Sequence, residues 1–258
     1  MQPAMQDDTD IGGRSPRFPV TRWSVLLAAR SEDPAQRTRA FETIVSGYWK
    51  PVYKYIRIRW NKSNEDAKDL TQEFFARVIE KDFLANYDPA AARLRTFLRV
   101  CVDRFLSNQE KSARRLKRGG DAVMLPLEFE SAEAELACGA HAATLSTPAA
   151  MEDYFEKEWL RHLFSLSLDA LRLQLTADGK LIYFRLFERY DLEEEDAARP
   201  TYAQLAREFG VTATAVTNYL ACARREFRRT VLEKLRDMSA TENEFRREAR
   251  AVLGIDPL

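Results

Sequence analysis

Residues 65–75 of the 258-residue chain read Glu65-Asp66-Ala67-Lys68-Asp69-Leu70-Thr71-Gln72-Glu73-Phe74-Phe75. Apolar side chains recur here at helical spacing, which predicts an amphipathic helix over about 65–80. The apolar positions are Ala67, Leu70, Phe74 and Val78. The opposite side is polar and carries Asp69, Gln72, Glu73 and Arg77. An acidic amphipathic helix is most often only a solvated face, so the alternative, a face that recognises a partner, depends on the rest of the chain.

The chain on either side predicts further helices and no strand. Asp33-Pro34 is a helix start, with the aspartate as N-cap and the proline at the first position, and Pro51 begins the next helix. A long helix is expected over about 91–111, and two more over about 155–175 and 179–190. Because no segment alternates with the period of a strand, the predicted fold class is all-α.

Charge is segregated along the chain, although 40 basic and 40 acidic residues sum to zero. Basic residues predominate between Arg93 and Arg118, where only Asp103 and Glu110 oppose them. Acidic residues predominate in the following segment, which runs from Asp121 to Glu158. This pattern predicts two basic, DNA-facing modules joined by an acidic connector.

The composition argues against several other classes of protein. No apolar run approaches the roughly 20 residues of a membrane span, and no signal-peptide pattern is present, so we expect a cytoplasmic protein without a membrane partner. The 3 cysteines are far apart and lack CxxC spacing, which is typical of buried thiols. The 2 histidines, His141 and His162, have no carboxylate at metal-ligand spacing. We expect no catalytic residue, metal or cofactor, and we expect His162 to be a packed surface residue.

A helix-turn-helix is predicted from Thr201 to Arg229. Thr201 and Gln204 fit a capping box, Gly210 can adopt the left-handed conformation that reverses the chain, and Thr212 can cap the second helix. One face of that helix is apolar and carries Val216, Leu220, Ala223 and Phe227. Short polar side chains near its start can approach base edges, and arginines further along can reach phosphates. The residues expected at DNA are Thr214, Thr217, Asn218, Arg224, Arg225, Arg228 and Arg229. The alternative is an ordinary helical hairpin with a solvated basic face.

Together, the acidic helix and the helix-turn-helix resemble the extracytoplasmic-function class of bacterial RNA polymerase sigma factors. The resemblance covers about Phe41–Arg118 and Leu160–Arg236. It implies that the helix-turn-helix reads the minus-thirty-five promoter element. It also implies partners: core RNA polymerase, through its clamp and flap, promoter DNA, and an anti-sigma protein or other regulator. The residues it assigns to polymerase binding are Asp69, Gln72, Glu73 and Arg77.

The basic segment resembles the part of this family that captures and melts the minus-ten promoter element. Melting requires neutralised phosphates and apolar surfaces that receive unstacked bases. The resemblance implies these roles for Arg95, Phe97, Arg99, Arg104, Arg114 and Arg115. Phe97 and Phe105 also fall on the apolar stripe of their helix, so core packing is the alternative for both. The chain departs from the family pattern where Asp103-Arg104 and Asn108 replace the usual Arg-Asn pair and following Asp.

The predicted organisation is two small helical domains joined by an acidic flexible linker. Residues 1–17 are expected to be disordered, 18–118 to form the polymerase-binding and minus-ten domain, and 155–236 to form the helix-turn-helix domain. The linker spans 119–154 and has room for one short packed segment. Residues 237–258 form a C-terminal extension, in which a short helix is favoured by Phe245, Ala249 and Val252.

The competing function is a stand-alone helix-turn-helix regulator that acts without polymerase docking, for which the acidic helix has no role. An enzyme, such as a nuclease, is disfavoured because the chain has no phosphate-binding glycine loop and no nucleophile motif. The linker and the extension lie outside the resemblance. Our hypothesis is that one of them folds over the basic DNA face and restrains DNA binding.

Overall fold

The computed structural model describes Ser31 and residues 33–80, 83–113, 127–138, 147–193 and 199–255. Throughout these ranges the regular structure is helical and contains no strand, which confirms the all-α prediction. The helices are α2 (Pro34–Arg59), α3 (Asn64–Glu80), α4 (Leu94–Ala113), α5 (Phe129–Cys138), α6 (Pro148–Ala177), α7 (Leu181–Phe187), α8 (Tyr202–Glu208), α9 (Ala213–Asp237) and α10 (Glu242–Leu253). A 3-10 turn, Phe83–Asn86, follows α3, and a π-helical turn, Glu188–Leu192, follows α7.

Helix α2 is one continuous helix, and the prediction that Pro51 begins a second helix is wrong. Its start is as predicted: the Asp33 carboxylate accepts a hydrogen bond from Ala35 N at 2.9 Å. An internal proline removes one backbone hydrogen bond and is costly. Here α2 is buried on both sides of Pro51, from Ala40 to Ile56, and tertiary packing of this kind outweighs a local preference.

The larger hydrophobic core surrounds α2. It is built from α2, α3, α4, α5, the first half of α6, the end of α9 and α10. Trp159 of α6 and Tyr53 of α2 are among the largest fully buried side chains in it. Phe129 of α5 packs against Trp49 and Tyr53, with ring centroids 5.4 and 5.1 Å apart. The described part of the predicted linker therefore holds a packed helix.

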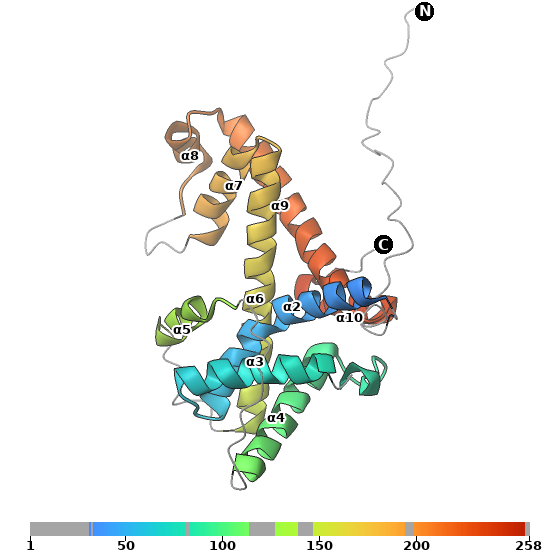
Figure 1. Ribbon diagram of the computed structural model, residues 1–258. Helices are drawn as coiled ribbons and strands as arrows, with labels where there is room; N and C mark the ends of the chain where they lie inside the picture. Colours follow the sequence, from blue (N-terminus) through green and yellow to red (C-terminus); the bar gives the residue numbers. More distant parts are fainter. Residues whose placement is uncertain are drawn as a thin grey trace, which may run out of the picture.

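A second, smaller core lies at the helix-turn-helix end. It joins the second half of α6 to α7, α8 and the start of α9 through Leu171, Leu175, Phe184, Leu205, Val216 and Leu220. Helix α6, about 45 Å long at 1.5 Å per residue, passes from one core to the other (Figure 1). The helix begins at Pro148, inside the predicted linker, where Thr147 accepts a hydrogen bond from Ala150 N at 3.1 Å. Helix α9 also contributes to both cores, so two continuous helices join the predicted domains.

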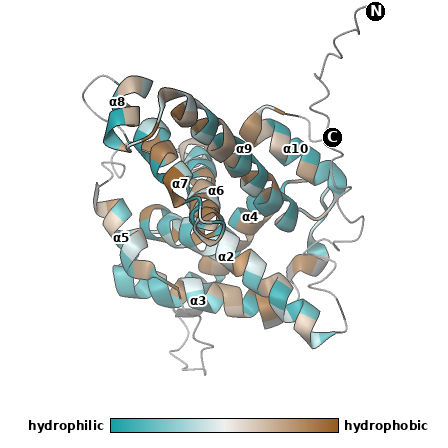
Figure 2. Cartoon of the chain, turned by 90° about the horizontal axis from the view of Figure 1, so that it is seen from above, coloured by the Kyte–Doolittle hydropathy of each residue, from teal (hydrophilic) through white to brown (hydrophobic). Residues whose placement is uncertain are grey.

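The C-terminal extension forms α10, which packs between the end of α9 and the start of α4. Thr241 caps it and Gly254 ends it in the left-handed conformation, with φ of 67°. Its buried residues are Glu244, Phe245, Glu248 and Ala249. Seen along α6, α3 and α10 lie on opposite sides of the molecule (Figure 2).

Some predictions fall outside the described residues. These are the disordered N-terminus over 1–17, the Gly119-Gly120 linker start, the histidine at position 141, and two basic residues assigned to the minus-ten region, Arg114 and Arg115. Among the helices that the structure describes, none is long and apolar enough to cross a membrane.

Candidate polymerase-docking face and nucleic-acid interface

Helix α3 turns its polar side outward, as its sequence predicts. Asp69 is exposed, while Gln72, Glu73 and Arg77 are half-buried. Glu73 and Arg77 form an ion pair at 2.6 Å, and the Gln109 amide of α4 donates a second hydrogen bond to Glu73. The Arg77 guanidinium also lies 5.1 Å from the centre of the Phe105 ring. The predicted set is therefore one surface, in which Asp69 is the most accessible charge and Glu73 is held in place.

The inner side of α3 differs in part from its predicted apolar stripe. Ala67, Phe74 and Val78 are buried as expected, but Leu70 is only half-buried. Thr71 and Phe75 are fully buried instead. Thr71 is tolerated there because its hydroxyl donates to the Ala67 carbonyl oxygen at 2.7 Å, which satisfies its polar atom. A pattern of apolar residues alone cannot identify such a position.

The helix-turn-helix has the local geometry that the sequence predicts. The Thr201 backbone N–H donates to the Gln204 side chain at 2.7 Å, and Gln204 N donates to the Thr201 hydroxyl at 3.3 Å, which completes the capping box. Gly210 has φ of 65°, a conformation that favours glycine. Thr212 caps α9 by accepting from Ala215 N at 3.1 Å. The two helices are thus fixed at the turn by caps and by one glycine.

The outer side of α9 carries most of the residues predicted to contact DNA. Six of them are exposed, Arg225 most clearly with a side chain 73% exposed. The six are Thr214, Thr217, Asn218, Arg224, Arg225 and Arg228. Short side chains stand in the first turns and arginines follow, which is the order that a groove-reading helix requires.

Two of the predicted DNA contacts, Arg224 and Arg229, join α9 to other elements of the molecule. Arg224 forms a bidentate ion pair with Asp191, at 2.8 and 2.9 Å, and this carboxylate raises the pKa of the guanidinium. Arg229 pairs with Glu226 and Glu233, and donates to Gln174 of α6 at 2.8 Å. In this conformation both arginines hold elements together, so part of the donor capacity of each guanidinium is already used.

The minus-ten residues of α4 are mostly covered. Arg95 has a side chain only 4% exposed and pairs with Glu156 of α6 and Glu248 of α10. Arg99 pairs with Asp103 at 3.4 Å and with Glu152 of α6 at 3.1 Å. In this conformation acidic residues of α6 and α10 pair with Arg95 and Arg99, and contact of these arginines with DNA stays a prediction.

The remaining minus-ten residues divide between core and surface. Phe97 is half-buried and packs on Tyr87, with ring centroids 5.2 Å apart, and Phe105 is buried beside Phe74. Core packing is therefore the outcome for Phe105, whereas Phe97 keeps part of its surface. Arg104 is exposed and is the one described arginine of this predicted set that remains open to solvent. The apolar stripe of α4 is thus used mainly for folding.

The acidic connector pairs with basic residues of α2 as well. Glu133 of α5 pairs with Arg57, and this hydrogen bond lowers the pKa of Glu133. Glu135 accepts from Lys50 and Lys54, each at 2.6 Å. Burial raises the pKa of Glu135, but the two lysines outweigh this effect, and its net pKa is lowered. The acidic segment is thus in contact with basic residues of α2 as well as with the arginines of α4.

The structure places His162 in the core and not on the surface, which corrects the expectation from sequence. Its Nε2 atom lies 2.7 Å from the Ser46 carbonyl oxygen of α2, and burial lowers its pKa to about 4.

Among the described residues, no group of three or more histidine, cysteine or acidic side chains is arranged to hold a metal ion. Comparison of the chain with protein-family models, with curated proteins and with solved structures gave no match.

Proposed function

We propose that this protein is a sigma factor of the extracytoplasmic-function type, which binds core RNA polymerase and directs promoter-specific initiation. One observation carries the proposal: two features occur together in this molecule. The first is a capped helix-turn-helix with an exposed polar and basic face, and the second is the outward polar face of α3. A helix-turn-helix alone indicates only DNA. The acidic helix is what extends the proposal to polymerase.

The two faces support different tasks. Asn218 and Arg225 of α9 are exposed and lie on the side away from the buried Val216 and Leu220, so they can enter a groove without unfolding the smaller core. Asp69 of α3 is exposed on a different helix, which packs in the larger core. A polymerase surface can therefore contact α3 while promoter DNA contacts α9.

The described conformation corresponds to a resting form in this proposal. Promoter melting requires basic side chains near the unpaired strand, but Arg95 and Arg99 are engaged by Glu152, Glu156 and Glu248. Engagement of polymerase would have to separate these acidic residues from α4. A ligand or partner shifts such an equilibrium only by the difference in its affinity for the two forms.

The deciding experiment is co-elution of the purified chain with bacterial core RNA polymerase. The test variant is Asp69→Lys/Glu73→Lys, and the matched control is Asp153→Lys/Asp169→Lys, which reverses two exposed charges on α6. Stoichiometric binding by the wild type and the control, lost in the test variant, supports the sigma-factor function. Binding of duplex DNA without any binding of polymerase would instead favour the stand-alone regulator.

A further inference from the structure

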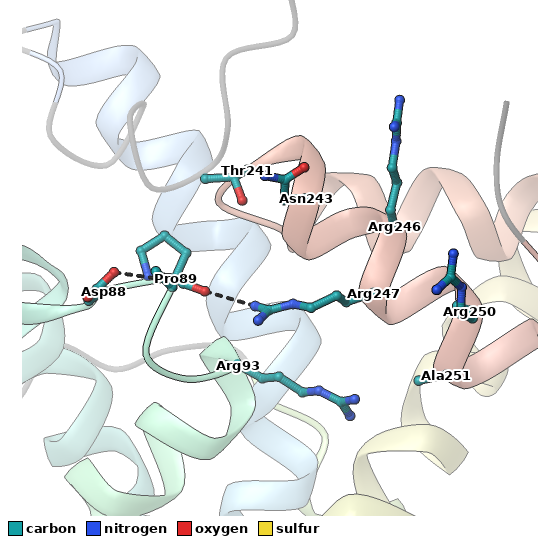
Figure 3. Close-up of a pocket in the computed structure, with 10 residues that line it drawn as sticks. Asp88, Pro89, Arg93, Thr241, Asn243, Arg246, Arg247, Arg250 and Ala251 are labelled. Carbon is teal, nitrogen blue, oxygen red and sulfur yellow. Dashed lines mark hydrogen bonds between the residues drawn. The ribbon is translucent and has the colours of Figure 1, made fainter.

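An open pocket of about 1130 Å³ lies between helix α10 and the segment that precedes α4. Arg93 reaches it from the start of α4, and α10 contributes Arg246, Arg247 and Arg250. Figure 3 shows Arg93 and Arg247 side by side, with Arg250 further along the same helix. Four arginines from two separate parts of the chain therefore line one depression of the surface, and Arg246 is the one that points away from Arg93 and Arg247.

The charges of α10 are sorted between its two sides. Glu244 faces inward and accepts hydrogen bonds from the Tyr87 hydroxyl at 2.5 Å and from Leu94 N at 3.0 Å. Glu248 also faces inward, where it pairs with Arg95 and lies 3.4 Å from Arg93. The arginines of α10 remain on the outer side, together with the exposed Glu242, which pairs with Arg246 at 3.3 Å. The buried carboxylates are thus used for docking α10, and they do not line the pocket.

The lining of the pocket has a clear excess of positive charge. Asp88 is the one acidic residue among those that line it, and its carboxylate already accepts a hydrogen bond from Ala90 N at 2.9 Å. Arg247 is fixed in place because it donates to the Pro89 carbonyl oxygen at 2.8 Å. A guanidinium has five N–H donors, so a single such bond leaves Arg247 with donors for a ligand. Gathered, oriented guanidinium groups are suited to the oxygens of phosphate.

We propose that this pocket binds a small ligand that carries two or more phosphate groups. Its volume is slightly above the roughly 300–1,000 Å³ of small-molecule sites. The site is a depression between two segments, unlike the exposed outer side of α9 that is proposed for duplex DNA. Several arginines at one site match a ligand with several negative charges. This inference is independent of the sigma-factor function.

Occupation of the pocket has a consequence for α10. The ligand would contact Arg93 on one wall and Arg247 or Arg250 on the other, so it would bind only while α10 is docked. A ligand that binds one form of a molecule stabilises that form. The same docking keeps Glu248 on Arg95. The ligand therefore strengthens the contact that covers the basic helix.

The test is isothermal titration calorimetry of the full chain with tripolyphosphate, pyrophosphate and inorganic phosphate at physiological salt. We expect saturable binding of one tripolyphosphate, weaker binding of inorganic phosphate, and a higher melting temperature with the ligand. Arg247→Gln/Arg250→Gln should weaken tripolyphosphate binding at least about ten-fold. Asn243→Asp adds a negative charge to the pocket at the first turn of α10, where a carboxylate favours the helix, and should weaken binding without lowering stability.

The matched control is Lys157→Gln/Arg207→Gln, which removes two exposed positive charges from α6 and α8 and should leave binding unchanged. Equal affinity in all four proteins, or no saturable binding by the wild type, overturns the proposal. Titration of the same proteins with duplex DNA distinguishes a small phosphate ligand from the phosphates of a nucleic-acid backbone. If Arg247→Gln/Arg250→Gln lowers only DNA affinity, the arginines contact the nucleic-acid backbone and the small-ligand assignment is wrong. Co-elution with polymerase should be unaffected by these variants, so the two proposals fail separately.

Discussion

Arg95, at the start of α4, is buried against Glu248 of α10, although 153 residues separate them along the chain. Glu156 of α6 pairs with the same guanidinium, which also lies 4.3 Å from the centre of the Trp159 ring. The side chains of Arg95 and Glu248 are 4% and 6% exposed. This contact joins α4, α6 and α10, and it fixes the position of the C-terminal extension.

The first prediction concerns the energy of this pair. Glu248→Leu leaves a buried arginine with one partner fewer and should lower the free energy of unfolding by about 3 kcal/mol. Burial raises the pKa of Glu248 although Arg95 and Arg93 oppose the shift, so its desolvation is incompletely compensated. Arg95→Met/Glu248→Leu should therefore lose less stability than either single substitution. Urea denaturation measures all four proteins, and strictly additive losses would show that the two residues are not coupled.

The second prediction separates two adjacent arginines of α9. Arg225 is exposed, whereas Arg224 is held by Asp191. Arg225→Ala and Asn218→Ala should weaken binding to the upstream promoter element by about 1–3 kcal/mol for each lost base contact, or reduce its salt dependence for a phosphate contact. Neither should change the melting temperature. Binding isotherms at several salt concentrations provide the measurement.

Arg224→Ala is the matched comparison for that experiment. Because Arg224 joins α9 to the turn after α7 through two hydrogen bonds, its loss should lower thermal stability while DNA affinity changes little. The pair is partly exposed, which limits the loss to about 1 kcal/mol. If Arg224→Ala weakened DNA binding as much as Arg225→Ala at unchanged stability, our assignment of the DNA-facing side of α9 would be wrong.

The third prediction is a pH dependence that originates at His162. Its pKa is lowered to about 4 by burial, against an ordinary value of 6.5, so the unfolded chain binds a proton that the folded chain rejects. The stabilisation is complete above pH 6.5 and is lost as the pH falls toward 4. At 1.36 kcal/mol per pKa unit, the loss at pH 4 is about 3 kcal/mol. Urea denaturation at pH 7.5 and pH 4 measures it.

His162→Gln provides the control for the pH experiment, because glutamine does not titrate and its amide can still donate to the Ser46 carbonyl. Carboxylates elsewhere also contribute to acid sensitivity, so the informative quantity is the difference between the two proteins. The wild type should lose about 3 kcal/mol more than the variant between pH 7.5 and pH 4. Equal losses would show that the pKa of His162 in the folded chain is not lowered.

Local signals in the sequence predicted local structure well. Thr201, Gly210 and Thr212 each act through neighbouring backbone atoms, and the structure has all three in the predicted roles. Asp33 likewise begins α2 as expected. The amphipathic face of α3 was predicted in part: Leu70 is only half-buried, and Thr71 and Phe75 are buried in addition to the expected residues.

Interactions between distant segments were not predictable in the same way. Arg95 looks like a DNA contact in the sequence because it stands among basic residues, and its acidic partners lie 61 and 153 positions away. Pro51 looks like a helix start because the local sequence does not show that α6, about 100 positions later, packs against α2. The segregated charge indicated that the basic segment binds an acidic partner. It did not show that this partner is an acidic segment of the same chain.

The last prediction tests whether the extension restrains DNA binding. Truncation after Ala240 removes Glu248 together with the rest of α10 and uncovers Arg95. If α10 acts only as a cover, affinity for a duplex with an unpaired segment should rise roughly ten-fold, as for one gained charge-assisted contact. Fluorescence anisotropy measures the affinity, and circular dichroism establishes that the helices persist. Arg95→Gln in the truncated chain should cancel the gain. Unchanged affinity would rule out the restraint, and a lower one would show that Arg246, Arg247 or Arg250 contributes to DNA binding.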